Sequence, residues 1–317
     1  MKKVLVTGAS GYIGTMLLEY FLNNNFNCIA VTRNKNKLKE FVRQKATVIE
    51  CNITKDDLTK YIDVKVDYII HCAAPTNSQY MISYPVEVAD AIFNGTKNIL
   101  DFSYKNKTEK IIYLSSMEAY GQIDFQENER ISEDRLGYFD IVNIRNCYPL
   151  SKIMSENLCI SYWREYKVPI IIARLSQTFG RGVSKEEKRV FAQFGKAVID
   201  NEDIILHTLG KSMGNYCDID DTIDAIVFLL NYGKLGEIYN IVNEQNAMTI
   251  KEMAEMVARE IADNKIEVII KELEIENKKY AADTGLRLSA QKMKDLGWEA
   301  KTSLKEMYIK MIADMKE

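Results

Sequence analysis

The sequence predicts an α/β protein built on a doubly wound parallel sheet, with a smaller C-terminal lobe interleaved with the sheet domain. In the first half, short apolar runs alternate with longer segments of helical periodicity, as in successive βαβ units. The apolar runs are continuous rather than alternating, which is typical of strands covered by helices on both faces. A length of 317 residues with 47% hydrophobic residues suits a globular chain of about two lobes.

The individual elements follow from the same patterns. Strands are expected at 4–6, 28–31, 47–51, 68–72, 111–114 and 170–173. Helices are expected to begin near Tyr12, Lys35, Pro85 and Pro149. Proline suits a first helical turn because the N–H that it lacks would have no partner there. Farther along, 218–230 predicts a helix and 238–242 another strand, so we expect the chain to leave the sheet domain, return and leave again.

The composition excludes several functional classes. The net charge of −3 and the scattered basic residues argue against a nucleic-acid partner. Two histidines are too few for a zinc site, and no run approaches the ~18 apolar residues of a membrane helix. The apolar run at the start is too short for a signal peptide, and six cysteines without a C-x-x-C pair are typical of reduced thiols. We therefore expect a cytoplasmic protein with no metal and no membrane partner.

The first predicted strand is followed by the segment TGASGYIG and then by a helical run. Its glycines allow a tight turn, a close approach of the backbone to a pyrophosphate, and close packing of the helix on the strand. The N–H groups at the helix N-terminus would then bind the phosphates. The segment therefore predicts a dinucleotide-binding domain of the Rossmann type. The expected cofactor contacts in this loop are Gly8, Ser10, Gly11, Tyr12, Ile13 and Gly14.

The end of the second strand indicates which dinucleotide binds. NAD-binding domains place an acidic residue there, about 20 residues after the glycines, to hold the ribose 2′-hydroxyl. Here the strand ends Val31-Thr32-Arg33-Asn34, with no carboxylate. The Arg33 guanidinium is suited to a 2′-phosphate, so the sequence predicts NADP(H). A solvated surface arginine is the alternative reading of Arg33, and tightly bound NAD is the alternative cofactor.

A catalytic constellation is expected from three residues farther along. Tyr148 and Lys152 in NCYPLSK are four positions apart, so they project from the same face of a helix. Tyrosine is too weak a base at neutral pH, but an adjacent lysine ammonium favours its phenolate form. Ser116, at the end of the strand in IIYLSSMEAYG, can hydrogen-bond the same reacting oxygen. Together these groups form a proton relay at a carbon that exchanges hydride with a nicotinamide.

The motifs together resemble an extended short-chain dehydrogenase/reductase of the nucleotide-sugar epimerase/dehydratase/reductase group. The resemblance covers nearly the whole chain and rests on TGASGYIG, HCAAP (71–75), NGTKNIL (94–100), SSMEAYG, YPLSK and LSAQKMKDLGWEAKTSLKEM (288–307). It implies further cofactor contacts at Asn52, Ile53, Ala73, Ala74, Tyr148 and Lys152. It also implies substrate contacts at Thr76, Ser116, Glu118, Gln177 and Arg181.

The resemblance further implies which lobe binds the dinucleotide and which binds the substrate. A nucleotide sugar would be carried by the second lobe, and a homodimer is expected. The expected dinucleotide-binding domain comprises 1–175 and about 217–245. The expected substrate-binding lobe comprises 176–216 and 246–317.

The sequence departs from the family in the region expected to bind substrate. Gln177 in RLSQTFG stands where the family commonly has an asparagine that touches the sugar nucleotide. The segment 211–221 lacks the arginine that the family uses for the diphosphate. Arg181, Arg189 or Lys211 could supply this charge, and for each the alternative is a solvated surface cation. The departures leave a nucleotide sugar as the expected substrate and the identity of the sugar open.

A second departure follows the catalytic serine. Related 4,6-dehydratases use an adjacent Asp–Glu pair there to drive elimination of water, and Met117 replaces the aspartate in this chain. Glu118, the remaining member, is expected either to contact substrate or to cap neighbouring backbone.

Reduction of a nucleotide-linked keto-sugar by NADPH is the leading functional hypothesis. Arg33 predicts the phosphorylated cofactor, which is usually consumed in net reductions, and Tyr148 would deliver the proton. A nucleotide-sugar 4-epimerase that uses the same three residues is the alternative. A 4,6-dehydratase is disfavoured by Met117, and a non-catalytic dinucleotide sensor is disfavoured by the intact Ser/Tyr/Lys set.

Overall fold

The computed structural model of the protein describes residues 1–123, 129–271 and 285–316, and the chain divides into two compact units. The first unit comprises Met1–Gln122, Leu136–Leu175 and Ile223–Tyr239. The second unit comprises Ile123–Arg135, Ser176–Thr222 and Asn240–Glu317.

The first unit is built on a seven-stranded sheet in the order β10-β6-β5-β4-β1-β2-β3. The strands are β1 (Lys3–Thr7), β2 (Asn27–Thr32), β3 (Thr47–Glu50), β4 (Tyr68–His71), β5 (Lys110–Ser116), β6 (Ile170–Leu175) and β10 (Ile238–Ile241). The ladders from β3 through β1 to β6 are parallel. The strand order reverses between β1 and β4, and in open α/β sheets ligands bind at the carboxyl ends of strands at such a point. The predicted doubly wound fold is confirmed.

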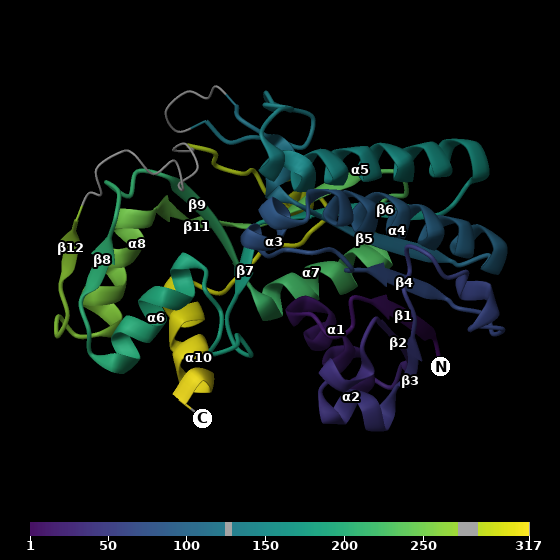
Figure 1. Ribbon diagram of the computed structural model, residues 1–317, viewed down its shortest axis with the longest axis horizontal. Coiled ribbons are helices and arrows are strands. Elements are labelled where there is room, and N and C mark those ends of the chain that lie inside the picture. Colours follow the sequence, from purple (N-terminus) through teal and green to yellow (C-terminus); the bar gives the residue numbers. More distant parts are fainter. Residues whose placement is uncertain (124–128, 272–284, 317) are drawn as a thin grey trace. The chain divides into compact units, whose positions relative to one another are not determined.

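Helices cover both faces of this sheet. They are α1 (Tyr12–Asn23), α2 (Glu40–Lys45), α3 (Ser78–Ser83), α4 (Pro85–Asn106), α5 (Cys147–Tyr166) and α7 (Ile219–Tyr232). Helices α4 and α5 lie on one face, and α1, α2 and α7 on the other (Figure 1). Because both faces are covered, every residue of the strand β6 is buried, as its continuous apolar run predicts. Within the described ranges, no helix is both long enough and apolar enough to cross a bilayer.

The helix expected from Lys35 is interrupted. Residues Lys35–Lys37 form only a short 3₁₀ turn, η1, in which the Asn34 side chain accepts the Asn36 N–H at 2.9 Å. Leu38 then has extended backbone, and helix α2 begins at Glu40. The side-chain cap thus stabilises a local turn in competition with a longer helix.

The second unit contains two small sheets and the remaining helices. One sheet has the order β11-β9-β7 and the other pairs β12 with β8. The strands are β7 (Gln177–Phe179), β8 (Ile204–Leu206), β9 (Met213–Asp218), β11 (Asn243–Thr249) and β12 (Val268–Ile270). The helices are α6 (Val190–Asp200), α8 (Ile250–Met256), the π-turn η5 (Val257–Ile261), α9 (Gln291–Asp295) and α10 (Leu304–Lys316). The rings of Phe179 and Phe191 stack in its core with their centroids 4.3 Å apart.

Residues 123–135 are an excursion from the first unit into the second. Within the second unit, the Ile131 N–H donates to the Arg287 carbonyl at 2.7 Å, and the Ser289 N–H donates to the Ile131 carbonyl at 2.9 Å. On either side of the excursion, Gln122 and Tyr138 exchange backbone hydrogen bonds of 2.9 and 2.8 Å. The chain therefore leaves the first unit and re-enters it at adjacent points.

Candidate active site

The glycine segment forms a cradle at the carboxyl end of β1. A Cβ atom at Gly14 would lie 2.3 Å from the Gly8 carbonyl oxygen, and one at Gly8 would lie 2.9 Å from the Ala73 backbone. Gly8 also has φ of +66°, a conformation that favours glycine. Gly11 precedes α1 without a side-chain cap, and the first turn of α1 contains no acidic residue. The residues therefore fit a dinucleotide, because the glycines leave room for a close approach of its pyrophosphate and the positive end of α1 favours the phosphates.

A hydrogen-bonded chain holds the backbone beside this cradle. The Ala73 N–H donates to Thr7 Oγ1 at 3.2 Å, so the Thr7 hydroxyl has its hydrogen available for His71 Nδ1, 2.7 Å away. His71 Nε2 then lies 3.1 Å from Thr96 Oγ1, which donates to the Ile92 carbonyl at 2.6 Å. This order makes Nε2 the protonated ring nitrogen of a neutral imidazole. His71 thereby ties β1 and β4 to α4 and positions the Ala73 amide.

Acid should weaken the protein through His71. Burial, reinforced by Lys152, lowers the pKa of His71 to about 3 from 6.5, so the folded protein keeps this ring neutral where the unfolded chain is protonated. The His71 contribution to the free energy of unfolding is complete above about pH 6.5. It falls by up to ~1.4 kcal/mol per pH unit as the pH drops toward 3. In urea titrations between pH 7 and 4, the stability difference between wild type and His71→Asn should therefore shrink with falling pH.

The exposed His207 provides the control for this experiment. His207→Asn makes the same substitution at an exposed position, and its unfolding curves provide the reference for His71→Asn. A difference between wild type and His71→Asn that stays constant over this range would contradict the assignment of a buried, neutral His71.

Arg33 follows β2 directly and is exposed. It borders a cleft of about 400 Å³ that is also lined by Pro75, Thr76, Asn77, Gln79, Tyr80, Ser83 and Tyr84. Within the described residues, Arg33 has no ion-pair partner. The structure thus brings together Arg33 and Thr76, two of the residues expected to bind ligands.

Other expected cofactor residues have defined protein contacts. Ser10 Oγ lies 3.2 Å from Thr32 Oγ1. The Asn52 side chain accepts the Thr54 N–H at 3.1 Å, so it closes a local turn. The Ile53 carbonyl accepts from the Asn98 side chain at 2.8 Å. These bonds fix the backbone at the ends of β1 to β3.

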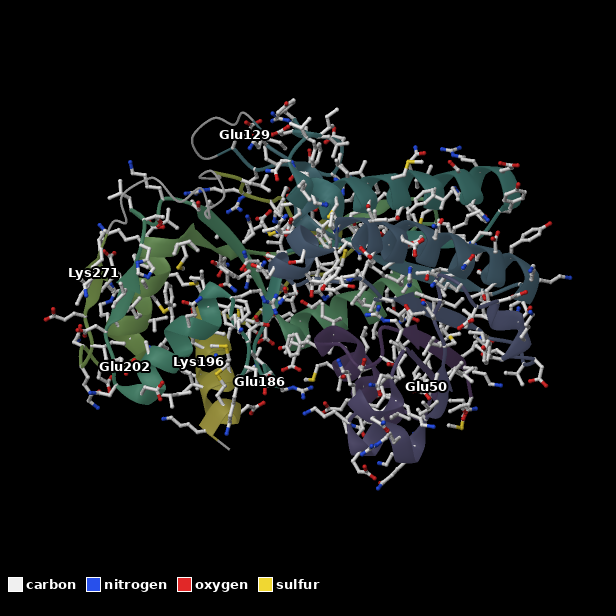
Figure 2. The ribbon with its side chains drawn as sticks, viewed as in Figure 1. Glu50, Glu129, Glu186, Lys196, Glu202 and Lys271 are labelled. Carbon is white, nitrogen blue, oxygen red and sulfur yellow. The ribbon has the colours of Figure 1, made fainter. Side chains whose placement is uncertain are left out.

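A carboxylate that sequence reasoning did not consider lies at the end of β3. Glu50, labelled in Figure 2, is aligned with Thr32 in the ladder between β2 and β3. Its carboxylate accepts the Lys35 N–H at 3.0 Å and pairs with the Lys35 ammonium at 3.7 Å. Glu50 therefore stabilises the turn after Arg33 through a hydrogen bond to the backbone and an ion pair, both with Lys35.

Tyr148 and Lys152, the tyrosine and lysine expected to be catalytic, lie on the first turns of α5. The Tyr148 ring is buried, 6% exposed, in an apolar cluster with Met81, Val88 and Ile92. Lys152 Nζ lies 5.8 Å from the centroid of the Tyr148 ring. Packing therefore fixes the tyrosine ring, and its hydroxyl is the only group on it able to exchange a proton.

Lys152 is buried between α5 and β5. Its ammonium donates to the Leu114 carbonyl at 2.7 Å and stands over the Tyr113 ring at 4.9 Å. Burial lowers the pKa of Lys152 to about 8, against the opposing attraction of the Glu156 carboxylate. Since an adjacent ammonium favours a phenolate, Lys152 is the group placed to stabilise the Tyr148 oxygen when the tyrosine gives up its proton.

Ser116 ends β5 and begins the 3₁₀ turn η3 (Met117–Tyr120). Its Oγ accepts the Glu118 N–H at 3.2 Å, which leaves the serine O–H free to donate to a substrate oxygen. Ser116 thus lies at the end of β5, and Lys152 contacts the Leu114 carbonyl of the same strand. Lys152 in turn lies one helical turn after Tyr148 on α5. A nicotinamide dinucleotide bound in the cradle would supply the hydride donor or acceptor.

Sequence reasoning missed three residues that lie near Lys152. The Arg174 guanidinium binds the Glu156 carboxylate through Nη2 at 2.8 Å and Nε at 3.0 Å, and the Ser115 hydroxyl donates to the same carboxylate. Arg174 is 2% exposed and Glu156 is 4% exposed. This buried pair joins α5 to β6 one helical turn beyond Lys152. The spacing of Lys152 and Glu156, four positions apart, is the signal that could have indicated a shared face.

Glu118 and Arg145 form another ion pair beside the catalytic residues. The two terminal guanidinium nitrogens of Arg145, Nη1 and Nη2, donate to the Glu118 carboxylate, with Nη2 to Oε1 at 3.0 Å. Arg145 lies in the 3₁₀ turn η4 (Ile144–Asn146) that immediately precedes α5. The hydrogen bond to Glu118 raises the pKa of Arg145 above its ordinary value.

The remaining expected substrate residues belong to the second unit. Gln177 begins β7 and is partly buried. Arg181 Nε donates to Asp220 Oδ1 at 2.8 Å, so this guanidinium already has an anionic partner.

A Rossmann sheet with a glycine cradle, together with Ser116, Tyr148 and Lys152 around β5 and α5, defines a dinucleotide-dependent enzyme of the short-chain dehydrogenase/reductase type. The chain belongs to the NAD dependent epimerase/dehydratase family, whose model matches residues 4–242. The expected membership in the extended nucleotide-sugar branch of these enzymes is confirmed.

Relatives with different named activities are similar to this chain. A dTDP-D-glucose 4,6-dehydratase of Dictyostelium discoideum is 27% identical over 76% of this chain, and the match spans 58% of that relative's length. UDP-glucuronic acid decarboxylase 3 of Arabidopsis thaliana is 26% identical over 96% of this chain and 86% of its own. A solved UDP-glucuronic acid 4-epimerase from Bacillus cereus, in complex with UDP-glucuronic acid and NAD, has a TM-score of 0.80 and 20% identity. That match covers 99% of each chain.

Proposed function

We propose that the protein is an NADPH-dependent reductase of a nucleotide-linked keto-sugar. The observation that carries the proposal is Arg33, an exposed guanidinium that follows β2 where NAD-binding domains place a carboxylate. Arg33 also borders the cleft that Thr76 lines, and its planar donor fork suits the 2′-phosphate of NADP(H). The nucleotide-sugar substrate is supported by the family and by the relatives named for dTDP- and UDP-sugars.

Each of the expected site residues would have a separate role in the reduction. Bound NADPH supplies the hydride to the carbonyl carbon. Ser116 orients the carbonyl oxygen with its free O–H, and Tyr148 delivers the proton to that oxygen. Lys152 holds the nicotinamide ribose and stabilises the phenolate that Tyr148 becomes. Gln177 and one of Arg181, Arg189 or Lys211 would bind the substrate's nucleotide and diphosphate.

A 4-epimerase with retained cofactor is the second candidate. Solved epimerases share the fold, and the Bacillus cereus enzyme was solved in complex with NAD. Epimerisation would use the same Tyr148 and Lys152 for oxidation and for the reverse transfer. Elimination is less well supported, because Met117 replaces the acid of a dehydratase pair and the Glu118 carboxylate is held by Arg145.

We also propose a cytoplasmic homodimer. All six cysteines are free, as expected for a reducing compartment. Val86 on α4 and Met154 on α5 are 76% and 53% exposed, so these helices offer apolar surface to a second copy.

Two measurements on the purified protein distinguish the candidates. Addition of a panel of UDP- and dTDP-linked 4-keto-sugars should cause steady loss of NADPH absorbance at 340 nm if the protein is a reductase. Denaturation of the protein as purified should then release little dinucleotide. Stoichiometric release of NAD, with interconversion of UDP-sugars and no net NADPH loss, would instead establish the epimerase.

Arg33→Ala should change cofactor preference. Loss of one charge-assisted contact to the 2′-phosphate is expected to lower kcat/KM for NADPH by about 10- to 100-fold, while kcat/KM for NADH changes little. The measurement is steady-state kinetics with both cofactors. Lys37→Ala removes an exposed cation of the neighbouring turn η1 and should leave the ratio unchanged. A wild-type enzyme that prefers NADH would contradict the assignment of NADP(H) as the cofactor.

A further inference from the structure

The two segments that carry the catalytic groups are separated by the excursion into the second unit. Ser116 ends β5, and the chain leaves the first unit after Gln122. It re-enters at Leu136 and reaches Tyr148 on the first turn of α5. The chain between them therefore does not itself align the serine with the tyrosine. Their alignment depends on bonds made directly between the two segments.

Backbone bonds hold the segments only at their outer ends. The Gly137 N–H donates to the Tyr120 carbonyl at 2.8 Å, and Gln122 and Tyr138 pair with each other. These bonds lie four or more residues from Ser116 and ten or more from Tyr148. They leave the stretch nearest the catalytic groups to be fixed by side chains.

The Lys152–Leu114 and Ser115–Glu156 bonds join β5 to the part of α5 that follows Tyr148, and the Glu118–Arg145 pair adds a connection on the side that precedes Tyr148. Glu118 is two positions after Ser116, and its N–H donates to Ser116 Oγ at 3.2 Å. Arg145 is three positions before Tyr148, and the Asn143 side chain accepts its N–H at 3.1 Å. The two side chains are joined by a bidentate contact, the geometry in which a guanidinium and a carboxylate restrict each other's orientation most. One short path of bonds thus runs from the catalytic serine to the first turn of α5.

The same pair should contribute little to global stability. The Arg145 and Glu118 side chains are 30% and 35% exposed, and pairs of such exposure typically contribute about 0–1 kcal/mol. We therefore expect the pair to affect the relative position of the two segments more than the free energy of unfolding.

We propose that Glu118 and Arg145 are positioning residues that clamp the Ser116 segment to the Tyr148 segment. The proposal rests on the proposed hydride-transfer function, and it assigns Glu118 to neither a substrate contact nor a proton transfer. A misplacement of about 1 Å between reacting groups can reduce rates about 100-fold. The clamp would therefore act on kcat, with little effect on the binding of substrate or cofactor.

The test compares Glu118→Gln, Arg145→Met, their double variant and the charge-swapped variant Glu118→Arg/Arg145→Glu. Each single variant should lose about 10- to 100-fold in kcat with KM and the Kd for NADPH nearly unchanged. The double variant should be no worse than either single one, because both remove the same connection. The charge swap should restore most of the lost kcat, since it rebuilds an ion pair of reversed polarity.

Arg43→Met breaks an exposed pair with Glu40 on α2 and should leave kcat unchanged. A single variant with wild-type kcat would overturn the clamp. An increase in KM at constant kcat would also overturn the clamp. The same holds for kcat losses that add in the double variant and are not recovered in the charge-swapped variant, because such results indicate direct contact with the reactants. Hydrogen exchange adds a readout that needs no substrate, in which peptides covering 116–122 and 137–148 should exchange faster in the single variants. If that exchange changes while even the wild type reduces no sugar, the clamp stands and the proposed function fails.

Discussion

Tyr148→Phe should reduce turnover by about 10²- to 10⁴-fold while NADPH still binds with near wild-type affinity. The Tyr148 ring is held by Met81, Val88 and Ile92, and phenylalanine fills the same apolar space. Only the hydroxyl that delivers the proton is lost. Steady-state kinetics and fluorescence titration of NADPH measure the two effects separately.

Tyr162→Phe is the matched control, because it makes the same change on the same helix. Tyr162 donates to Asp101 Oδ1 at 2.6 Å, remote from Lys152 by nearly three helical turns. Its loss should leave kcat within about twofold. A Tyr148→Phe enzyme that kept more than a tenth of its activity would refute the proton-donor role.

Glu156→Leu should destabilise the first unit by about 3–5 kcal/mol, the largest stability effect we expect from a single substitution at this site. The change leaves the Arg174 guanidinium, 2% exposed, without its carboxylate and leaves the Ser115 hydroxyl without its acceptor. An unpaired buried charge costs far more than the pair contributes, because desolvation is no longer offset. Urea unfolding monitored by circular dichroism should show the loss as a lower midpoint.

The double variant Glu156→Leu/Arg174→Met separates this explanation from a simple packing defect. Removal of both charges should recover much of the stability lost in the single variant. The exposed pair of Lys251 and Glu255 on α8 is the control, and Glu255→Gln should change the unfolding free energy by less than about 1 kcal/mol. A double variant as unstable as Glu156→Leu would contradict the charge argument.

Much of the first unit could be predicted because its signals are local. Each strand is a continuous apolar run flanked by polar residues, and Gly8, Gly11 and Gly14 follow β1 at fixed spacing. Tyr148 and Lys152 were placed on one helix face from their spacing alone, and both lie on α5. Patterns of this kind depend only on neighbours in the chain, so one sequence is enough to read them.

The contacts that depend on distant parts of the chain could not be predicted. Arg145 and Glu118 are 27 positions apart, and nothing in either segment identifies the other as its partner. Arg174 lies within an apolar run, and only the folded sheet brings its side chain to Glu156. The place of Ile131 in the second unit also depends on distant residues, because backbone pairing with Arg287 and Ser289 holds it there.

The discontinuity of both units imposes an order on folding during synthesis. The sheet of the first unit is complete only when β10 has been made, and by then Ser176–Thr222 of the second unit has also been made. The helix α10, whose Tyr308 packs against Phe179 at 5.3 Å between ring centroids, has not. A nascent chain at this stage therefore carries a closed first unit beside an unfinished core that still exposes apolar rings. Such intermediates are prone to aggregation, so the addition of α10 protects apolar surface in the segments made before it.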